Sequence, residues 1–249
     1  MRLPSFGQFS PLGSLGPLRL ASLVVALGTT ALLSACGGGA EIEFSGGGGG
    51  GGGGGTQYPR PNPNPNPPTQ SCSQAGLAAS AASQWPTVCM LTSSGEMVVE
   101  LYDTYAPQTV ANFYKYVGAG FYSNTLIHRV DRDFVIQGGG YTSGMVAKQP
   151  LYAPIKLESN NNLSNLRGTI AMARRSDADS ATSQFFFNVQ DNTSLDYQSA
   201  ASPGYAVFGR IISGLATLDA INVVPTYTYS QTDIEPRTEV LVYWVQRLK

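Results

Sequence analysis

From residue 96 onward, apolar and polar residues alternate in short runs that glycine, proline, asparagine and aspartate separate. Such runs are typical of antiparallel β-strands joined by tight turns, because successive side chains of a strand point to opposite faces. The pattern predicts strands at residues 96–102, 126–130, 134–137, 169–174, 184–189, 205–211 and 240–247.

Two segments show a helical pattern instead. Apolar residues recur at i, i+3, i+4 and i+7 from Val110 to Val117, Pro107 suits a first helical turn, and Gly118 can end the helix. A second short helix fits residues 214–221. Many short strands with two helices predict a mainly β fold, an antiparallel barrel capped by two helices.

One predicted strand carries an arginine among apolar neighbours. Arg129 follows His128, the only histidine of the chain, and a second apolar run from Phe134 ends in three glycines, Gly138 to Gly140. A guanidinium stays charged, so burying it without partners costs free energy. We therefore infer that Arg129 is retained to donate hydrogen bonds to a bound peptide.

The N-terminal residues have the features of an export signal. Arg2 and Arg19 precede an apolar run, residues 20–33, that is too short to span a membrane comfortably. It ends in a segment, residues 33–36, that resembles the bacterial lipobox, in which the cysteine is lipidated. We expect residues 1–35 to be a lipoprotein signal peptide and Cys36 to carry a membrane anchor; an ordinary signal peptide is the alternative.

Residues 36–71 have the composition of a spacer. Gly46 to Gly55 is an unbroken glycine run, typical of flexible coil, and residues 59–68 alternate proline with other residues, which favours polyproline II. We expect a disordered tether that holds a domain of residues 72–249 off a bilayer. The alternative is a ligand for a proline-binding module.

The cysteine and charge content limits the chemistry. Cys72 and Cys89 flank an alanine-rich segment of helical propensity, residues 75–83, and in an exported protein we expect them to form a disulfide; two unrelated buried thiols are the alternative. The absence of CxxC and HExxH argues against a zinc site, and we expect no metal and no cofactor. A net charge of -1 without a basic block argues against nucleic acid as a partner.

Four ordered sequence blocks resemble the cyclophilin family of peptidyl-prolyl isomerases, most closely its bacterial periplasmic branch. They are FYSNTLIHRV with DFVIQGGG (residues 121–130 and 134–140), RGTIAMAR (167–174), SATSQFFFN (180–188) and GYAVFG (204–209). The likeness covers residues 96–249. It implies a closed eight-stranded antiparallel barrel with two capping helices, and it implies isomerisation of X–Pro bonds, which needs no nucleophile, metal or proton relay.

The resemblance assigns a role to each of ten residues. Arg129 matches the catalytic arginine, which would donate to the prolyl nitrogen, and Gln137 would help to orient it. The matched substrate-binding positions are Phe134, Val135, Phe186, Leu195 and Tyr205 for an apolar proline pocket, with Gln184, Ala173 and Arg174 for the peptide backbone. His128 matches a supporting residue.

Three positions depart from the family pattern. Ser194 stands where the family usually has Trp or Phe, which removes a ring from the pocket and predicts weak binding of cyclosporin-type macrocycles. Val135 replaces the usual Met. The acidic turn, residues 131–133, replaces a Pro-Gly-type turn and adds charge at the rim.

Together these features predict a monomeric, lipid-anchored isomerase that acts on proline-containing clients in the bacterial cell envelope, at the outer membrane and facing the periplasm. One alternative is a cyclophilin-like chaperone or scaffold with weak turnover. Another is a small-ligand carrier, but a carrier needs an open lumen, and Phe185 and Phe208 are bulky candidates to fill the barrel.

Overall fold

The computed structural model describes residues 59–231 and 233–249. The predicted signal peptide, the lipidation site Cys36 and the glycine run lie outside the described residues. Within the two described ranges, no helix has both the length and the apolar character needed to span a bilayer.

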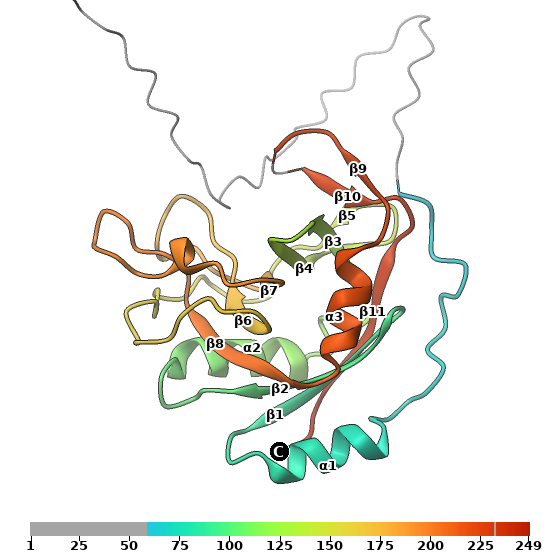
Figure 1. Cartoon of the computed structure of the whole chain (residues 1–249), viewed down its shortest axis with the longest axis horizontal. Helices are drawn as coiled ribbons and strands as arrows, with labels where there is room; N and C mark the ends of the chain where they lie inside the picture. Colours follow the sequence, from blue (N-terminus) through green and yellow to red (C-terminus); the bar gives the residue numbers. More distant parts are fainter. Residues whose placement is uncertain (1–58, 232) are drawn as a thin grey trace, which may run out of the picture. The chain divides into compact units, whose positions relative to one another are not determined.

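The described chain folds around a closed antiparallel barrel (Figure 1). Its ring order is β3-β11-β1-β2-β8-β6-β7-β4, and the pairing of β4 with β3 closes the eight-stranded ring. These strands are β1 Thr87–Thr92, β2 Gly95–Leu101, β3 Thr125–Asp131, β4 Val135–Thr142, β6 Thr169–Met172, β7 Phe185–Asn188, β8 Val207–Ser213 and β11 Val240–Arg247. The predicted fold class is confirmed.

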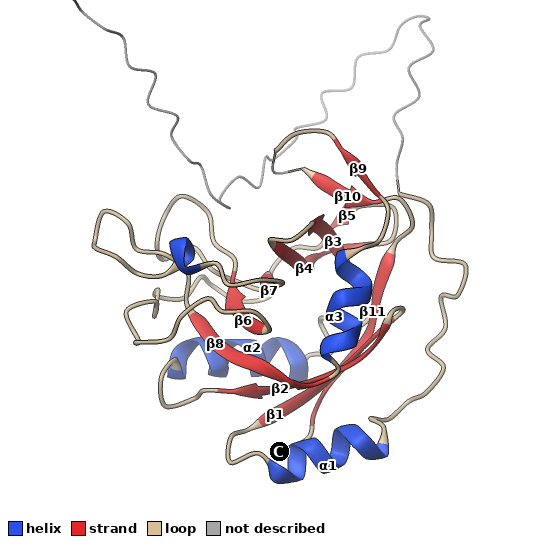
Figure 2. Cartoon of the chain, in the orientation of Figure 1, coloured by secondary structure: helices blue, strands red, loops and turns tan. Residues whose placement is uncertain are grey.

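Short strands and helices lie outside the eight-stranded ring. β5 (Val146–Ala147) pairs with β4, and β9 (Thr226–Thr228) with β10 (Ile234–Pro236) forms a separate hairpin. The helices are α1 (Gln74–Ala82), α2 (Pro107–Gly118) and α3 (Leu215–Asn222), with a 3-10 turn η1 (Thr193–Leu195), as Figure 2 shows. The alanine-rich segment of predicted helical propensity forms α1, a third helix beside the two that were predicted to cap the barrel, and it lies against β1, β2 and β8.

Large side chains fill the barrel. Met90, Met97, Phe185 and Phe208 are fully buried in the main core cluster, which also takes in Phe113 of α2. The helical face predicted from Val110 to Val117 therefore packs onto the barrel, and α3 adds Leu218 and Ile221 in the same way. Because the interior is packed with side chains, the small-ligand carrier is wrong.

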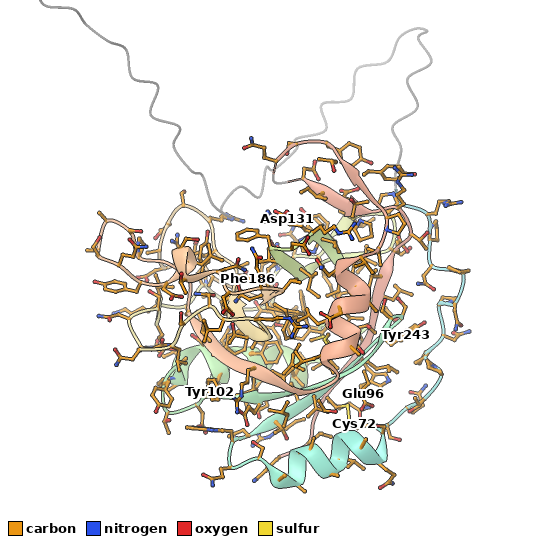
Figure 3. The ribbon with its side chains drawn as sticks, in the orientation of Figure 1. Cys72, Glu96, Tyr102, Asp131, Phe186 and Tyr243 are labelled. Carbon is orange, nitrogen blue, oxygen red and sulfur yellow. A yellow bond between two sulfur atoms is a disulfide. The ribbon has the colours of Figure 1, made fainter. Side chains whose placement is uncertain are left out.

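The last part of the predicted tether, residues 59–71, is hydrogen-bonded to the barrel. Trp244 Nε1 donates to the Thr69 carbonyl (3.0 Å) and Gln246 Nε2 to the Gln70 carbonyl (2.9 Å). The Tyr243 hydroxyl donates to the carbonyl of Asn64 (2.6 Å; Tyr243 is labelled in Figure 3). This part of the segment is therefore not a disordered spacer, because side chains of β11 hold its carbonyl groups.

A disulfide joins Cys72, at the end of this segment, to Cys89 on β1, as predicted. Glu96 lies beside it and caps α1, since its carboxylate accepts hydrogen bonds from the Ser73 amide (2.8 Å) and hydroxyl (2.7 Å). The start of the folded domain is thus fastened to the barrel by a covalent bond and a helix cap.

Candidate active site

One row of residues crosses four neighbouring strands. Arg129 on β3 lies opposite Gln137 on β4, which lies opposite Phe186 on β7, which in turn lies opposite Ala171 on β6. Residues directly opposite each other in antiparallel strands share one face of the sheet. The adjacent row, which includes Ile136, points into the core, so the row that begins with Arg129 lies on the outer face of the barrel.

Apolar side chains gather around Phe186 on this face. We call the outer cluster the buried residues Val135, Ala171, Phe186, Leu195, Tyr205 and Val207, with half-buried Phe134, Leu163 and Ala173 packed against them. The rings of Phe186 and Tyr205 meet edge to face at 5.5 Å. The structure thus brings together every apolar residue predicted for the proline pocket, from two strands and three loops.

The guanidinium of Arg129 is held in place at the edge of this surface. Arg129 is 7% exposed, and its Nη2 donates to Oδ2 of Asp131 at 2.7 Å. Arg129 and Phe186 are separated by one intervening strand, so their backbones lie about 10 Å apart at ~4.8 Å per strand. A fixed cationic donor therefore lies beside the outer cluster, within the length of a short peptide (Asp131 and Phe186 are labelled in Figure 3).

Gln137 is paired with the second predicted glutamine. Its Nε2 donates to Oε1 of Gln184 at 2.8 Å, so the two glutamines form one polar pair next to Phe186. The Arg129 guanidinium is also bound by Asp131, from the acidic turn. Its carboxylate holds the arginine by charge as well as by a hydrogen bond.

Arg174 lies at the rim of the outer cluster. Its guanidinium stacks over the Tyr205 ring at 4.8 Å, and its Nε donates to the Gly204 carbonyl at 2.9 Å. The Ala173 amide donates to the Gln184 carbonyl at 3.0 Å. Both residues therefore brace the pocket from the loop after β6.

His128 is buried beneath the ring of Tyr141, with ring centroids 4.6 Å apart. Burial lowers the pKa of His128 to about 4, because desolvation disfavours the imidazolium. The imidazole is therefore neutral at neutral pH and is a poor proton donor, which agrees with the supporting position predicted for it.

A network of buried asparagines fixes the loops of the outer cluster. Asn192 Nδ2 donates to the Phe134 carbonyl (2.9 Å) and to Oδ1 of Asn188 (2.9 Å), and Asn188 Nδ2 donates to Oδ1 of Asn165 (3.1 Å). The Leu195 amide donates to the Asn192 carbonyl at 2.9 Å. Asn188 ends the sequence block SATSQFFFN, directly after three phenylalanines, whereas no sequence pattern pointed to Asn165 or Asn192.

The three departures from the family sequence pattern lie at different places around the outer cluster. Ser194 is exposed in η1 and is absent from the outer cluster, whereas its neighbour Leu195 is buried in it. Val135 is fully buried in the cluster. Asp133 turns the chain with φ 57° and accepts a hydrogen bond from Asn222 of α3 at 2.9 Å. The outer cluster therefore forms around Leu195 and Val135 without a ring at position 194.

The described residues bring metal-ligand types together in one place, around Cys72, Cys89 and Glu96. The two sulfurs are bonded to each other, so neither is available as a thiolate. The outer face itself offers a held guanidinium, Arg129, as a hydrogen-bond donor beside the apolar outer cluster.

Comparison with known proteins places the chain in a family. Residues 87–243 match the family described as cyclophilin type peptidyl-prolyl cis-trans isomerase/CLD. The chain is 48% identical over 157 residues to a peptidyl-prolyl cis-trans isomerase of Acinetobacter baylyi (63% of this chain, 82% of that protein). It is 43% identical over 153 residues to peptidyl-prolyl cis-trans isomerase B of Escherichia coli (61% and 93%).

Solved structures show the same fold. A cyclophilin type isomerase of Cryptosporidium parvum superposes with a TM-score of 0.58 at 24% identity, covering 66% of this chain and 97% of that one. A second structure of that protein, in the presence of the dipeptide Ala-Pro, gives 0.56 at 25% identity, covering 65% and 98%. The chain belongs to the cyclophilin family and is a peptidyl-prolyl cis-trans isomerase.

Proposed function

We propose that this isomerase acts on X–Pro bonds of exported proteins in the bacterial cell envelope, with Arg129 as its catalytic residue. The observation that carries the catalytic assignment is the guanidinium of Arg129, held by Asp131 on the same outer face as the outer cluster. The pairing of a fixed donor with an apolar pocket supports binding of a proline ring next to a hydrogen bond.

The reaction is rotation about a conjugated bond. Partial double-bond character gives the X–Pro amide a barrier of about 18–20 kcal/mol, and twisting returns the lone pair to the prolyl nitrogen. An N–H of Arg129 directed at that nitrogen stabilises the twisted amide more than the planar one, because the nitrogen accepts a hydrogen bond only after it loses conjugation. This differential binding lowers the barrier.

The other residues bind and orient the peptide. The outer cluster takes the pyrrolidine ring and removes water around it, and the pair Gln137–Gln184 offers amide groups to the peptide backbone. Arg174 keeps Tyr205 in place. No proton is transferred, so the neutral imidazole of His128 is compatible with the reaction.

Replacement of Arg129 tests the assignment. In Arg129→Ala we expect kcat/KM for a proline tetrapeptide such as Ala-Ala-Pro-Phe to fall by about 100-fold or more, because one preorganised donor is lost. A protease-coupled assay measures turnover, and calorimetry measures the Kd, which we expect to change by less than about threefold. Arg210→Ala is the control, since Arg210 also forms an ion pair on a strand, with Glu100 at 2.8 Å.

The second candidate, a peptide-binding scaffold with weak turnover, is favoured by exposed Ser194, which offers no ring to the pocket. Peptide binding without turnover in the unmodified protein would support the scaffold. Turnover that survives in Arg129→Ala would refute the catalytic role of Arg129.

We further propose that Cys36 carries a lipid and that the protein is a monomer anchored at the outer membrane, facing the periplasm. The lipobox-like segment, residues 33–36, supports the lipid anchor, and Gly37 supports the outer membrane, because some bacteria require Asp at that position to keep a lipoprotein in the inner membrane. The disulfide Cys72–Cys89 is typical of an oxidising compartment.

Fractionation of bacterial cells tests the anchor. We expect the full-length protein in the outer-membrane fraction, with a diacylglycerol-sized mass increase on the peptide that begins at Cys36. We expect Cys36→Ala to leave that fraction. An unmodified mature N-terminus, or a Cys36→Ala protein that stays in the outer membrane, would refute lipidation at this residue.

A further inference from the structure

The loop between β5 and β6 carries a leucine onto the outer cluster. Leu163 is half-buried and packs against the buried members of this cluster, although its loop has no periodic pattern. Leu166, three residues later in the same loop, is 44% exposed and does not belong to the cluster. Leu163 therefore packs on the outer cluster, whereas Leu166 does not.

The residues before Leu163 direct it toward the pocket. Asn161 Nδ2 donates to the carbonyl of Val207 at 2.9 Å, which fastens the loop to β8 at a member of the outer cluster. Asn161 Oδ1 accepts the Leu163 amide at 3.1 Å, so the side chain also shapes the turn. Asn162 lies between them at φ 62°, a left-handed conformation that asparagine tolerates.

The residues after Leu163 are fastened to the other side of the pocket. The Ser164 hydroxyl donates to Asp196, and the backbone amide and Nδ2 of Asn165 donate to Asp196 Oδ1 at 2.7 and 2.8 Å. Asp196 directly follows Leu195 of the outer cluster. Leu163 is thus held between β8 and the loop after η1 by hydrogen bonds on both sides.

We propose that Leu163 is a wall of the proline pocket and supplies apolar contact that Ser194 does not. Ser194 is exposed, and its short polar side chain makes no apolar contact with a ligand. Leu163 is half-buried, so one part of its side chain packs on the outer cluster and the other part is accessible to a ligand. A branched aliphatic side chain at this place contacts the methylene groups of a pyrrolidine ring. The inference rests on the proposed use of the outer cluster for X–Pro substrates.

Leu163→Ala tests the proposal, with Leu166→Ala as the matched control from the same loop. We expect kcat/KM for Ala-Ala-Pro-Phe to fall about tenfold in Leu163→Ala, chiefly through KM, which corresponds to ~1.4 kcal/mol. We expect Leu166→Ala to stay within about twofold of the parent. Thermal unfolding of both variants reports whether either has lost its fold, and Leu163→Met restores the contact without the branch.

A second substitution examines the relation to Ser194. In Ser194→Phe a ring is added beside Leu195, and we expect it to recover most of the activity lost in Leu163→Ala while changing the parent by less than about threefold. Equal kcat/KM and equal Kd for Leu163→Ala and Leu166→Ala would overturn the proposal. Absence of turnover in every protein, with tetrapeptide binding that still depends on Leu163, would refute the proposed catalysis and leave the pocket wall supported.

Discussion

Asp131 contributes a negative charge directly beside the one guanidinium that the proposed mechanism needs. It lies two residues after Arg129 on β3, so both side chains leave the strand on the same face, and their side chains are only 22% and 9% exposed. The sequence predicted the arginine and the acidic turn separately. Their pairing was missed because the predicted strand ended at residue 130, whereas β3 extends to Asp131.

Asp131→Asn keeps an acceptor but removes the charge. We expect kcat to fall about three- to tenfold with little change in KM, because a neutral amide orients the guanidinium less firmly. Steady-state kinetics with a proline tetrapeptide measures both constants. Asp219→Asn is the control, since Asp219 pairs with Arg167 on the exposed surface. An unchanged kcat in Asp131→Asn would mean that other contacts of Arg129 suffice to orient it.

At the scale of elements, prediction succeeded where a long apolar run marks the strand. β11 runs over the residues predicted for it, 240–247, although its first six residues are all buried. β1 is buried throughout as well and was missed, because its shorter run has threonine at both ends and shows no alternation of buried and exposed residues. The predicted strand at 205–211 begins two residues later, since Tyr205 belongs to the loop that carries it into the outer cluster.

The loops were the least predictable elements. The contact of Leu163 with the outer cluster and the bond from Asn192 to Phe134 each join segments far apart in the chain. Neither contact produces a periodic pattern of apolar residues from which it could be predicted. The site residues that matched family motifs could be named in advance, whereas the residues that position them could not.

The disulfide between Cys72 and β1 lends itself to a stability test. A closed loop of this size, with a sequence separation of 17, stabilises a fold by about 3 kcal/mol, so we expect the double variant Cys72→Ser/Cys89→Ser to lose that much free energy of unfolding. Urea unfolding measures the loss. We expect kcat/KM to be unchanged, because both cysteines pack in a cluster separate from the outer one. A fall in kcat/KM without a loss of stability would contradict this separation.

At the scale of the whole molecule, the resemblance to cyclophilins predicted the closed eight-stranded barrel, and the two capping helices are α2 and α3. The alanine-rich composition of residues 75–83 indicated the third helix, α1, whereas the composition of residues 59–71 gave no sign that they bind to the barrel. Asparagine and proline repeats are typical of free linkers. Here the side chains of Tyr243, Trp244 and Gln246 on β11 donate hydrogen bonds to carbonyl groups of residues 59–71. These bonds need no N–H from the bound segment, so proline, which lacks an N–H, is compatible with them.

This docking limits how far the enzyme could work from a bilayer. If a lipid sits on Cys36, only the residues up to 58 remain to bridge from the bilayer surface to the barrel, since the next dozen are bound along β11. A fully extended chain covers at most about 3.5 Å per residue, or ~80 Å for this length. Client proteins would therefore have to reach the isomerase at a distance from the bilayer surface of at most about 80 Å plus the width of the domain.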